Sequence, residues 1–206
     1  MFCVEPMYKS NYQIGDVGFT ARPGTFLHNN IALETDRASQ EAGRLVPSHA
    51  LLITGPNQMV EATWPNVHET ELSPLIEDPE ALLWVCRPLG QTEAAAQETI
   101  RLARAIAKDK APYDWKAFWG FVTSDKDGAD GQPNSYQKDK AWFCSELVFY
   151  TLKATAHLRA VQWPAEVATW PKGFVSPDRL YDFPIWDSLR LKAAGGGMVR
   201  SNIMWN

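Results

Sequence analysis

Ser48-His-Ala-Leu-Leu-Ile-Thr54 and Gln58-Met-Val-Glu-Ala-Thr63 are two runs of strand-forming residues, and the turn formers Gly55-Pro56-Asn57 separate them. Two such runs around a short, turn-rich segment are typical of a β-hairpin. We therefore predict an antiparallel hairpin over residues 48–63, and the rest of the fold is built outward from it.

The segments around this hairpin continue the same architecture. We predict three further strands and two main helices, with a short helix and a last strand near the C-terminus. The strands are Gly15–Phe19, Val67–Leu72 and Ala81–Leu89, the helices are Thr92–Lys108 and Phe143–His157, and the short helix and last strand are Ser176–Phe183 and Ile185–Leu191. The predicted fold class is α+β, with a small antiparallel sheet or half-barrel packed against helices.

Length and composition point to one folded domain. The chain has 206 residues, of which 45% are hydrophobic, and this is enough apolar surface for one sizeable core. We expect a single domain over residues 1–192, followed by a Gly-rich joint and tail over residues 193–206. The tail carries apolar residues, so we expect it to dock, and residues 198–206 are a candidate contact for a protein partner.

Charge and hydropathy exclude several classes of partner. The formal net charge is −4, which leaves no basic surplus for nucleic acid. No segment approaches the about 18 apolar residues of a membrane span, and the N-terminal residues lack the pattern of a secretory signal. We therefore expect synthesis in the cytoplasm without export, with delivery to the cell envelope or carriage in a phage particle as open alternatives.

Cys144 is the best-placed candidate nucleophile. It lies at the predicted first turn of a helix, where free backbone N–H groups favour a thiolate. Such a thiol needs a base, and the chain has four histidines. His28 lies in an irregular region, His68 on a polar strand edge, and His157 about 20 Å along the helix from the thiol. His49, in the hairpin, is the remaining candidate.

Strand parity connects His49 to Glu61. Opposed residues of an antiparallel pair have a constant index sum, and a three-residue loop with Thr54 opposite Gln58 makes that sum 112. His49 and Glu61 then lie on one face as diagonal neighbours, so Glu61 is the candidate that orients the imidazole. An even loop would place the two side chains on opposite faces.

Each candidate has a simpler alternative. Free cysteines are often buried core residues, a strand histidine is often structural, and a glutamate is usually exposed. Cys3 and Cys86 have no plausible base, and we interpret both as structural. Most tryptophans are expected in the core. Three of them precede a proline and could line a substrate groove: Trp64, which is the candidate substrate-binding residue, Trp163 and Trp170.

Taken in order, seven segments resemble the YiiX and YaeF group of permuted papain-like amidases in the NlpC superfamily. The resemblance spans about residues 15–183, and no single segment is specific without the others. The segments are GDVGF, PSHALLI, MVEAT, the strand ending in CRP, APYDW, WFCSELV and VSPDRLYDF.

The resemblance implies a permuted papain-like (NlpC-type) domain with Cys144 as nucleophile, His49 as general base and Glu61 as the polar third member. Tyr113 and Asp114 match the YD segment of the family and are candidate substrate-binding residues, with structural capping as the alternative. No metal or organic cofactor is expected.

The implied activity is that of a cysteine hydrolase which cleaves amide bonds, with cell-wall peptides as the first candidate substrate. A lipid-directed acyl hydrolase or transferase is the alternative enzyme. A structural or interaction subunit, for example of a virion, is the alternative without turnover, because a fold does not fix an activity.

Overall fold

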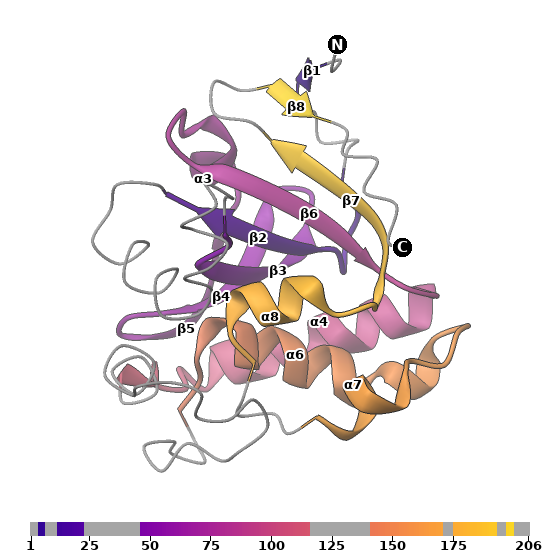
Figure 1. Cartoon of the computed structure of the whole chain (residues 1–206). Coiled ribbons are helices and arrows are strands. Elements are labelled where there is room, and N and C mark those ends of the chain that lie inside the picture. The colour runs from indigo at the N-terminus through magenta and orange to yellow at the C-terminus, as the bar shows by residue number, and fades with distance from the viewer. Residues whose placement is uncertain are drawn as a thin grey trace, which may run out of the picture.

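A computed structural model describes residues 4–6, 12–22, 46–115, 141–170, 175–192 and 197–199, with backbone alone at 4–6, 188–192 and 197–199. It is an α+β structure in which an antiparallel sheet lies on a layer of helices (Figure 1). The eight strands have the order β1-β8-β7-β6-β2-β3-β4-β5. The strands are β1 (Val4–Pro6), β2 (Val17–Ala21), β3 (His49–Gly55), β4 (Gln58–Thr63), β5 (Asn66–Glu71), β6 (Leu82–Pro88), β7 (Trp186–Lys192) and β8 (Gly197–Val199).

Two long helices and several short ones complete the described fold. The α-helices are α3 (Ser73–Glu77), α4 (Glu93–Lys108), α6 (Cys144–Ala154), α7 (Ala165–Thr169) and α8 (Pro177–Asp182), with the short 3₁₀-helix η2 (Ala156–Leu158). The predicted strands and main helices are confirmed, whereas α3, η2, α7 and the strands β1 and β8 were not predicted. The predicted irregular region that contains His28 lies largely outside the described residues, and residues 116–140 lie outside them as well.

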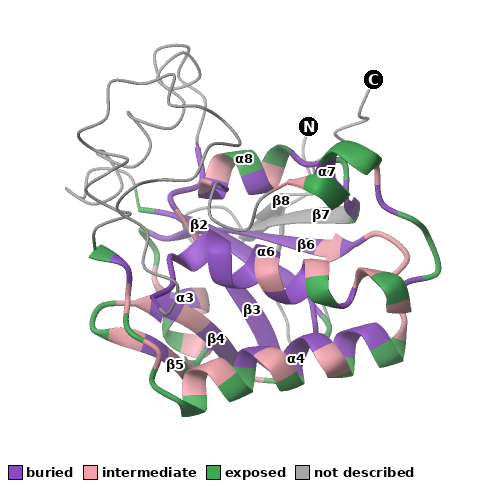
Figure 2. Cartoon of the chain, turned by 90° about the horizontal axis from the view of Figure 1, so that it is seen from below, coloured by how far each residue is buried: buried purple, intermediate pink, exposed green. Residues whose placement is uncertain are grey.

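Both faces of the central sheet are buried. Ala50 and Leu52 of β3 join the core under α4 and α6, while Leu51 and Ile53 join a second cluster with Leu75 of α3. Alternate residues of a strand point to opposite faces, so a strand covered on both sides is apolar without alternation. This explains why the apolar residues Ala50 to Ile53 follow one another without alternation in β3. Figure 2 shows α6 buried along most of its length and α4 exposed on its outer side.

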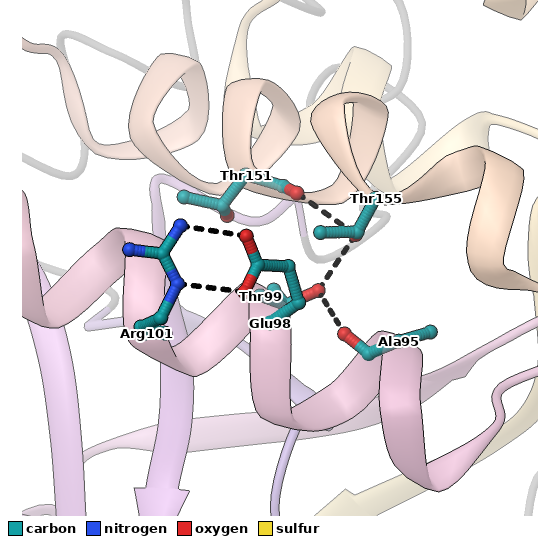
Figure 3. Close-up of polar contacts among 6 residues, drawn as sticks. All are labelled: Ala95, Glu98, Thr99, Arg101, Thr151 and Thr155. Carbon is teal, nitrogen blue, oxygen red and sulfur yellow. Dashed lines mark hydrogen bonds and ion pairs between the residues drawn. The ribbon is translucent and has the colours of Figure 1, made fainter.

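A buried threonine cluster joins α4 to the end of α6 (Figure 3). The hydroxyl oxygens of Thr99 and Thr155 lie 2.7 Å apart, within hydrogen-bonding distance of the carbonyls of Ala95 and Thr151 respectively. These buried hydroxyls therefore have partners, as buried polar groups require. The junction holds α6, whose first residue is Cys144, in a defined position on the sheet.

The first and last described strands, β1 and β8, pair at one edge of the sheet. β8, which lies in the predicted tail, pairs with both β7 and β1. Residues 200–206 lie outside the described part of the chain. Among the described helices, none has the length and apolar character needed to cross a membrane.

Candidate active site

Cys144 is the first residue of α6, and local contacts explain why the helix begins there. Phe143 is extended and its carbonyl accepts the first helical hydrogen bond, from Leu147. The buried carboxylate of Glu146 accepts a hydrogen bond from the Phe143 N–H at 3.3 Å. Ser145 Oγ donates to the carbonyl of Val175 at 2.5 Å, which anchors the first turn to the segment before α8. The thiol therefore lies at a fixed helix N-terminus, next to backbone N–H donors.

His49 is the first residue of β3, and Glu61 lies on the neighbouring strand β4. The register pairs Leu51 with Glu61 and Leu52 with Val60, so the index sum is 112, as predicted. The loop itself differs from the predicted one: Gly55 pairs with Gln58, and a bulge lies between Ile53 and Gly55. A two-residue turn with one bulge gives the same parity as a three-residue loop. His49 and Glu61 therefore lie on one face.

The three predicted groups meet in a chain. Glu61 Oε2 accepts a hydrogen bond from His49 Nε2 at 2.7 Å. His49 also hydrogen-bonds to the side chain of Cys144. Because Glu61 occupies Nε2, Nδ1 is the ring nitrogen left for the thiol. Sulfur, imidazole and carboxylate thus have the order that an activated cysteine nucleophile needs.

The pKa of His49 is set by opposing effects. Burial alone would lower it, but the charge of Cys144, the hydrogen bonds to Cys144 and Glu61, and the charge of Glu61 raise the pKa to about 10. Burial of Glu61 would raise its pKa, yet the hydrogen bond from His49 and the charges of His49, His68 and Arg22 lower it. The site therefore favours the charged imidazolium form of His49, beside the Glu61 carboxylate.

The reactive groups open into a cavity of about 730 Å³. Cys144, only 1% exposed, lies in its wall with His49 and Glu61. Most of the other lining residues are apolar or aromatic, as is usual for ligand sites. These apolar and aromatic residues are Met59, Ala62, Trp64, Pro74, Leu75, Tyr113 and Trp115.

The predicted substrate-binding residues do not all reach the cavity. Tyr113 and Trp64 line it, and Trp64 is 67% exposed. Burial and the charges of Cys144 and Asp114 raise the pKa of Tyr113 well above its usual value. Asp114 is itself buried and is not among the lining residues; its backbone N–H donates to the carbonyl of Trp142. Its position fits the structural alternative better than contact with substrate.

The structure adds three residues that the sequence reasoning missed. Arg22 and Trp115 line the cavity, and Arg22 Nη2 lies 2.8 Å from Asp78 Oδ2. His68, placed by sequence on a polar strand edge, has its Nε2 3.5 Å from Glu61 Oε1. A two-residue turn at Trp64–Pro65 gives β4 and β5 the index sum 129, which places Glu61 opposite His68, so turn length was the available signal.

One further described cysteine and one further described histidine, Cys86 and His157, do not join this site. Cys86 is fully buried in β6, and burial followed by the charge of Asp16 raises the pKa of its thiol well above the usual range. His157 is exposed in η2. Cys3 and His28 lie outside the described residues. The structural interpretation of Cys86 therefore agrees with its surroundings.

Comparison with known proteins identifies the fold. The sequence matches no known family profile and no curated protein. A solved structure that is similar is a protein of Escherichia coli O157:H7 described as metalloprotein yiiX, DUF1105. The likeness covers 84% of this chain and 94% of that chain, with a TM-score of 0.54 and 18% sequence identity. The chain therefore has a YiiX-like fold.

The description of that neighbour as a metalloprotein raises the question of a metal site. Within the described ranges, no group of three or more His, Cys, Asp or Glu side chains is arranged to hold a metal ion. His49 Nε2 donates a hydrogen bond to the carboxylate of Glu61, and His68 Nδ1–H donates to the carbonyl of Asn66 at 3.0 Å. In this part of the chain the side chains of His49 and Glu61 therefore hydrogen-bond each other, and that of His68 hydrogen-bonds a backbone carbonyl.

Proposed function

We propose that this protein is a cysteine hydrolase that cleaves amide bonds, with Cys144 as nucleophile, His49 as general acid and base, and Glu61 as the group that orients His49. The observation that carries the proposal is the chain of contacts from Cys144 through His49 to Glu61 at an open cavity. The YiiX-like fold and the resemblance to permuted papain-like enzymes of the NlpC superfamily support it. Peptide amides of the cell wall are the first substrate class.

In the proposed reaction, Cys144 Sγ attacks the amide carbonyl carbon and a carbon–sulfur bond forms. The oxyanion is stabilised in this proposal by the backbone N–H of Cys144, which is the first residue of α6. The carbon–nitrogen bond then breaks, and the His49 imidazolium gives its proton to the leaving amine. Water, deprotonated by His49, hydrolyses the thioester and returns the thiol.

The direct test is the rate at which iodoacetamide alkylates Cys144, measured by peptide mass spectrometry between about pH 5 and 9. The thiolate is the reactive form, and an ordinary thiol with a pKa of about 8.5 is ionised to only about 1% at pH 6.5. We expect Cys144 to react at least about tenfold faster than a small thiol at that pH, and His49→Ala to remove the advantage. His49, whose pKa is raised to about 10, keeps its proton until the pH approaches that value.

The control for this test is His157→Ala, because His157 is exposed in η2 and has no part in the site. It should leave the profile unchanged. A slow Cys144 in the wild type, or a fast one that does not depend on His49, contradicts the proposed function.

The apolar cavity favours a second candidate, hydrolysis or transfer of an apolar acyl group. Trp64 is the most exposed of the large apolar side chains on the described residues and lines the cavity. We expect Trp64→Ala to raise KM by about three- to tenfold with little change in kcat, because a wall residue binds ground and transition states alike.

Substrate series separate the two candidates. In 4-nitrophenyl esters of increasing acyl length, an acyl enzyme gains kcat/KM with chain length and loses this gain in Trp64→Ala. An amidase for polar peptides shows no such trend and prefers peptide nitroanilides. An unchanged KM for both series in Trp64→Ala would remove Trp64 from the substrate site.

A further inference from the structure

The carboxylate of Glu61 lies between two histidines from two different strands. Its Oε2 accepts the hydrogen bond from His49 at 2.7 Å, and its Oε1 lies 3.5 Å from the Nε2 of His68. Glu61 and His68 are directly paired across β4 and β5, and His49 is diagonal to Glu61 across β3 and β4. Cross-strand neighbours at these positions are within reach of each other.

The second nitrogen of His68 is already committed. Its Nδ1 lies 3.0 Å from the carbonyl oxygen of Asn66, which can only accept a hydrogen bond, so Nδ1 carries a proton. The neutral ring then presents a bare Nε2 to the carboxylate. Nε2 donates toward Glu61 only when His68 binds its second proton. The contact between His68 and Glu61 therefore depends on pH.

We propose that His68 is a positioning residue that holds the Glu61 carboxylate against His49, and through it sets the reactivity of Cys144 at acidic pH. The inference rests on the proposed cysteine chemistry. The side chain of Glu61 is 14% exposed, and its carboxylate hydrogen-bonds to His49. A contact that restricts the Glu61 carboxylate therefore also restricts the imidazole of His49. Sequence reasoning assigned no role to His68.

Several charged groups surround the carboxylate. His49 faces it from β3, His68 from β5, and the charge of Arg22, which follows β2, also acts on it. Arg22 keeps its charge at every pH of the test, since guanidinium groups stay protonated in proteins. A variant at position 68 leaves Arg22 and His49 unchanged, so it isolates the effect of His68 on the Glu61 carboxylate.

The test compares His68→Phe, which has a ring without a donor, with His68→Gln, whose amide donates at any pH. The measurement is again the pH profile of Cys144 alkylation by iodoacetamide. We expect Cys144 in His68→Phe to react about two- to fivefold more slowly than in the wild type at pH 6, in keeping with a partly exposed charged contact. The two rates should become equal at alkaline pH. His68→Gln should retain the wild-type rate at pH 6 and lose the pH-dependent component. His157→Gln is the matched control.

The possible outcomes are distinct. A His68→Phe profile that is parallel to the wild type, whether equal, uniformly slower or faster, overturns the inference, because a merely structural residue shifts all pH values alike. If His68→Phe does not fold, His68→Val replaces it, since valine favours strands and also lacks a donor. A wild-type Cys144 that reacts without regard to His49 overturns the proposed function itself, which separates that failure from failure at His68.

Discussion

Cys144→Ser is expected to lower the turnover of a 4-nitrophenyl ester by at least about 10³-fold, because a hydroxyl is a far weaker nucleophile than a thiolate at neutral pH. The substitution keeps the size class of the side chain and the start of α6, whose contacts at Phe143, Glu146 and Ser145 do not involve the sulfur. The loss should therefore appear in kcat/KM rather than in the thermal transition. The assay measures nitrophenolate release, and mass spectrometry detects the acetyl group on the Cys144 peptide when 4-nitrophenyl acetate is used.

The matched control is Cys86→Ala. Cys86 is buried in β6 with a raised thiol pKa, so it does not supply a nucleophile. Turnover per folded molecule should be unchanged, and the acetylated peptide should still be that of Cys144. If Cys144→Ser retains turnover within about tenfold of the wild type, another group carries the reaction and the proposed mechanism fails.

The hairpin shows how far strand parity reaches. Parity predicted that His49 and Glu61 share a face, and the register confirms this, but the loop was predicted incorrectly. The turn is tighter by one residue, and the bulge near Thr54 restores the sum. The alternation of apolar and polar residues in the sequence does not reveal a bulge or the shorter turn that accompanies it, because both depend on how the strands twist in the sheet. The correct face was therefore reached through an incorrect turn.

Short elements and remote contacts could not be predicted in the same way. α3 and α7 have five residues each and are held by packing of Leu75 and Val167, not by helix propensity. The approach of Cys144 to His49 is a tertiary contact. Elimination of the other histidines left His49 as the candidate base, and the family resemblance supported that pairing. His68 was missed because only the first hairpin was tested for parity.

A large loss of stability is expected when a buried ion pair is broken. The pair joins two of the sequence segments on which the family resemblance is based. Asp16 of the GDVGF segment is 1% exposed, and its two oxygens accept hydrogen bonds from Arg87 Nε and Nη2, both at 2.9 Å. Arg87 lies in the strand that ends in CRP. Asp16 immediately precedes β2, and Arg87 lies in β6; these two strands pair in the centre of the sheet. The pair ties the entry of β2 to the end of β6, next to the strand that carries His49.

Arg87→Met is expected to lower the free energy of unfolding by about 3–5 kcal/mol, because it leaves the carboxylate of Asp16 buried without its cation. The measurement is equilibrium unfolding in urea, with the slope compared between variants. The remaining hydrogen bond to Asp16, from the backbone N–H of Gln13 at 2.8 Å, does not replace a guanidinium.

The double variant Asp16→Asn with Arg87→Met separates the two possible origins of this loss. It removes the buried charge along with its partner, so it should be more stable than Arg87→Met alone. If the double variant is as unstable as the single one, the loss comes from the packing of the Arg87 side chain, which is 23% exposed, and not from an unpaired carboxylate. If Arg87→Met lowers the free energy of unfolding by less than about 1 kcal/mol, the ion pair contributes no more than an ordinary surface ion pair, despite the burial of Asp16.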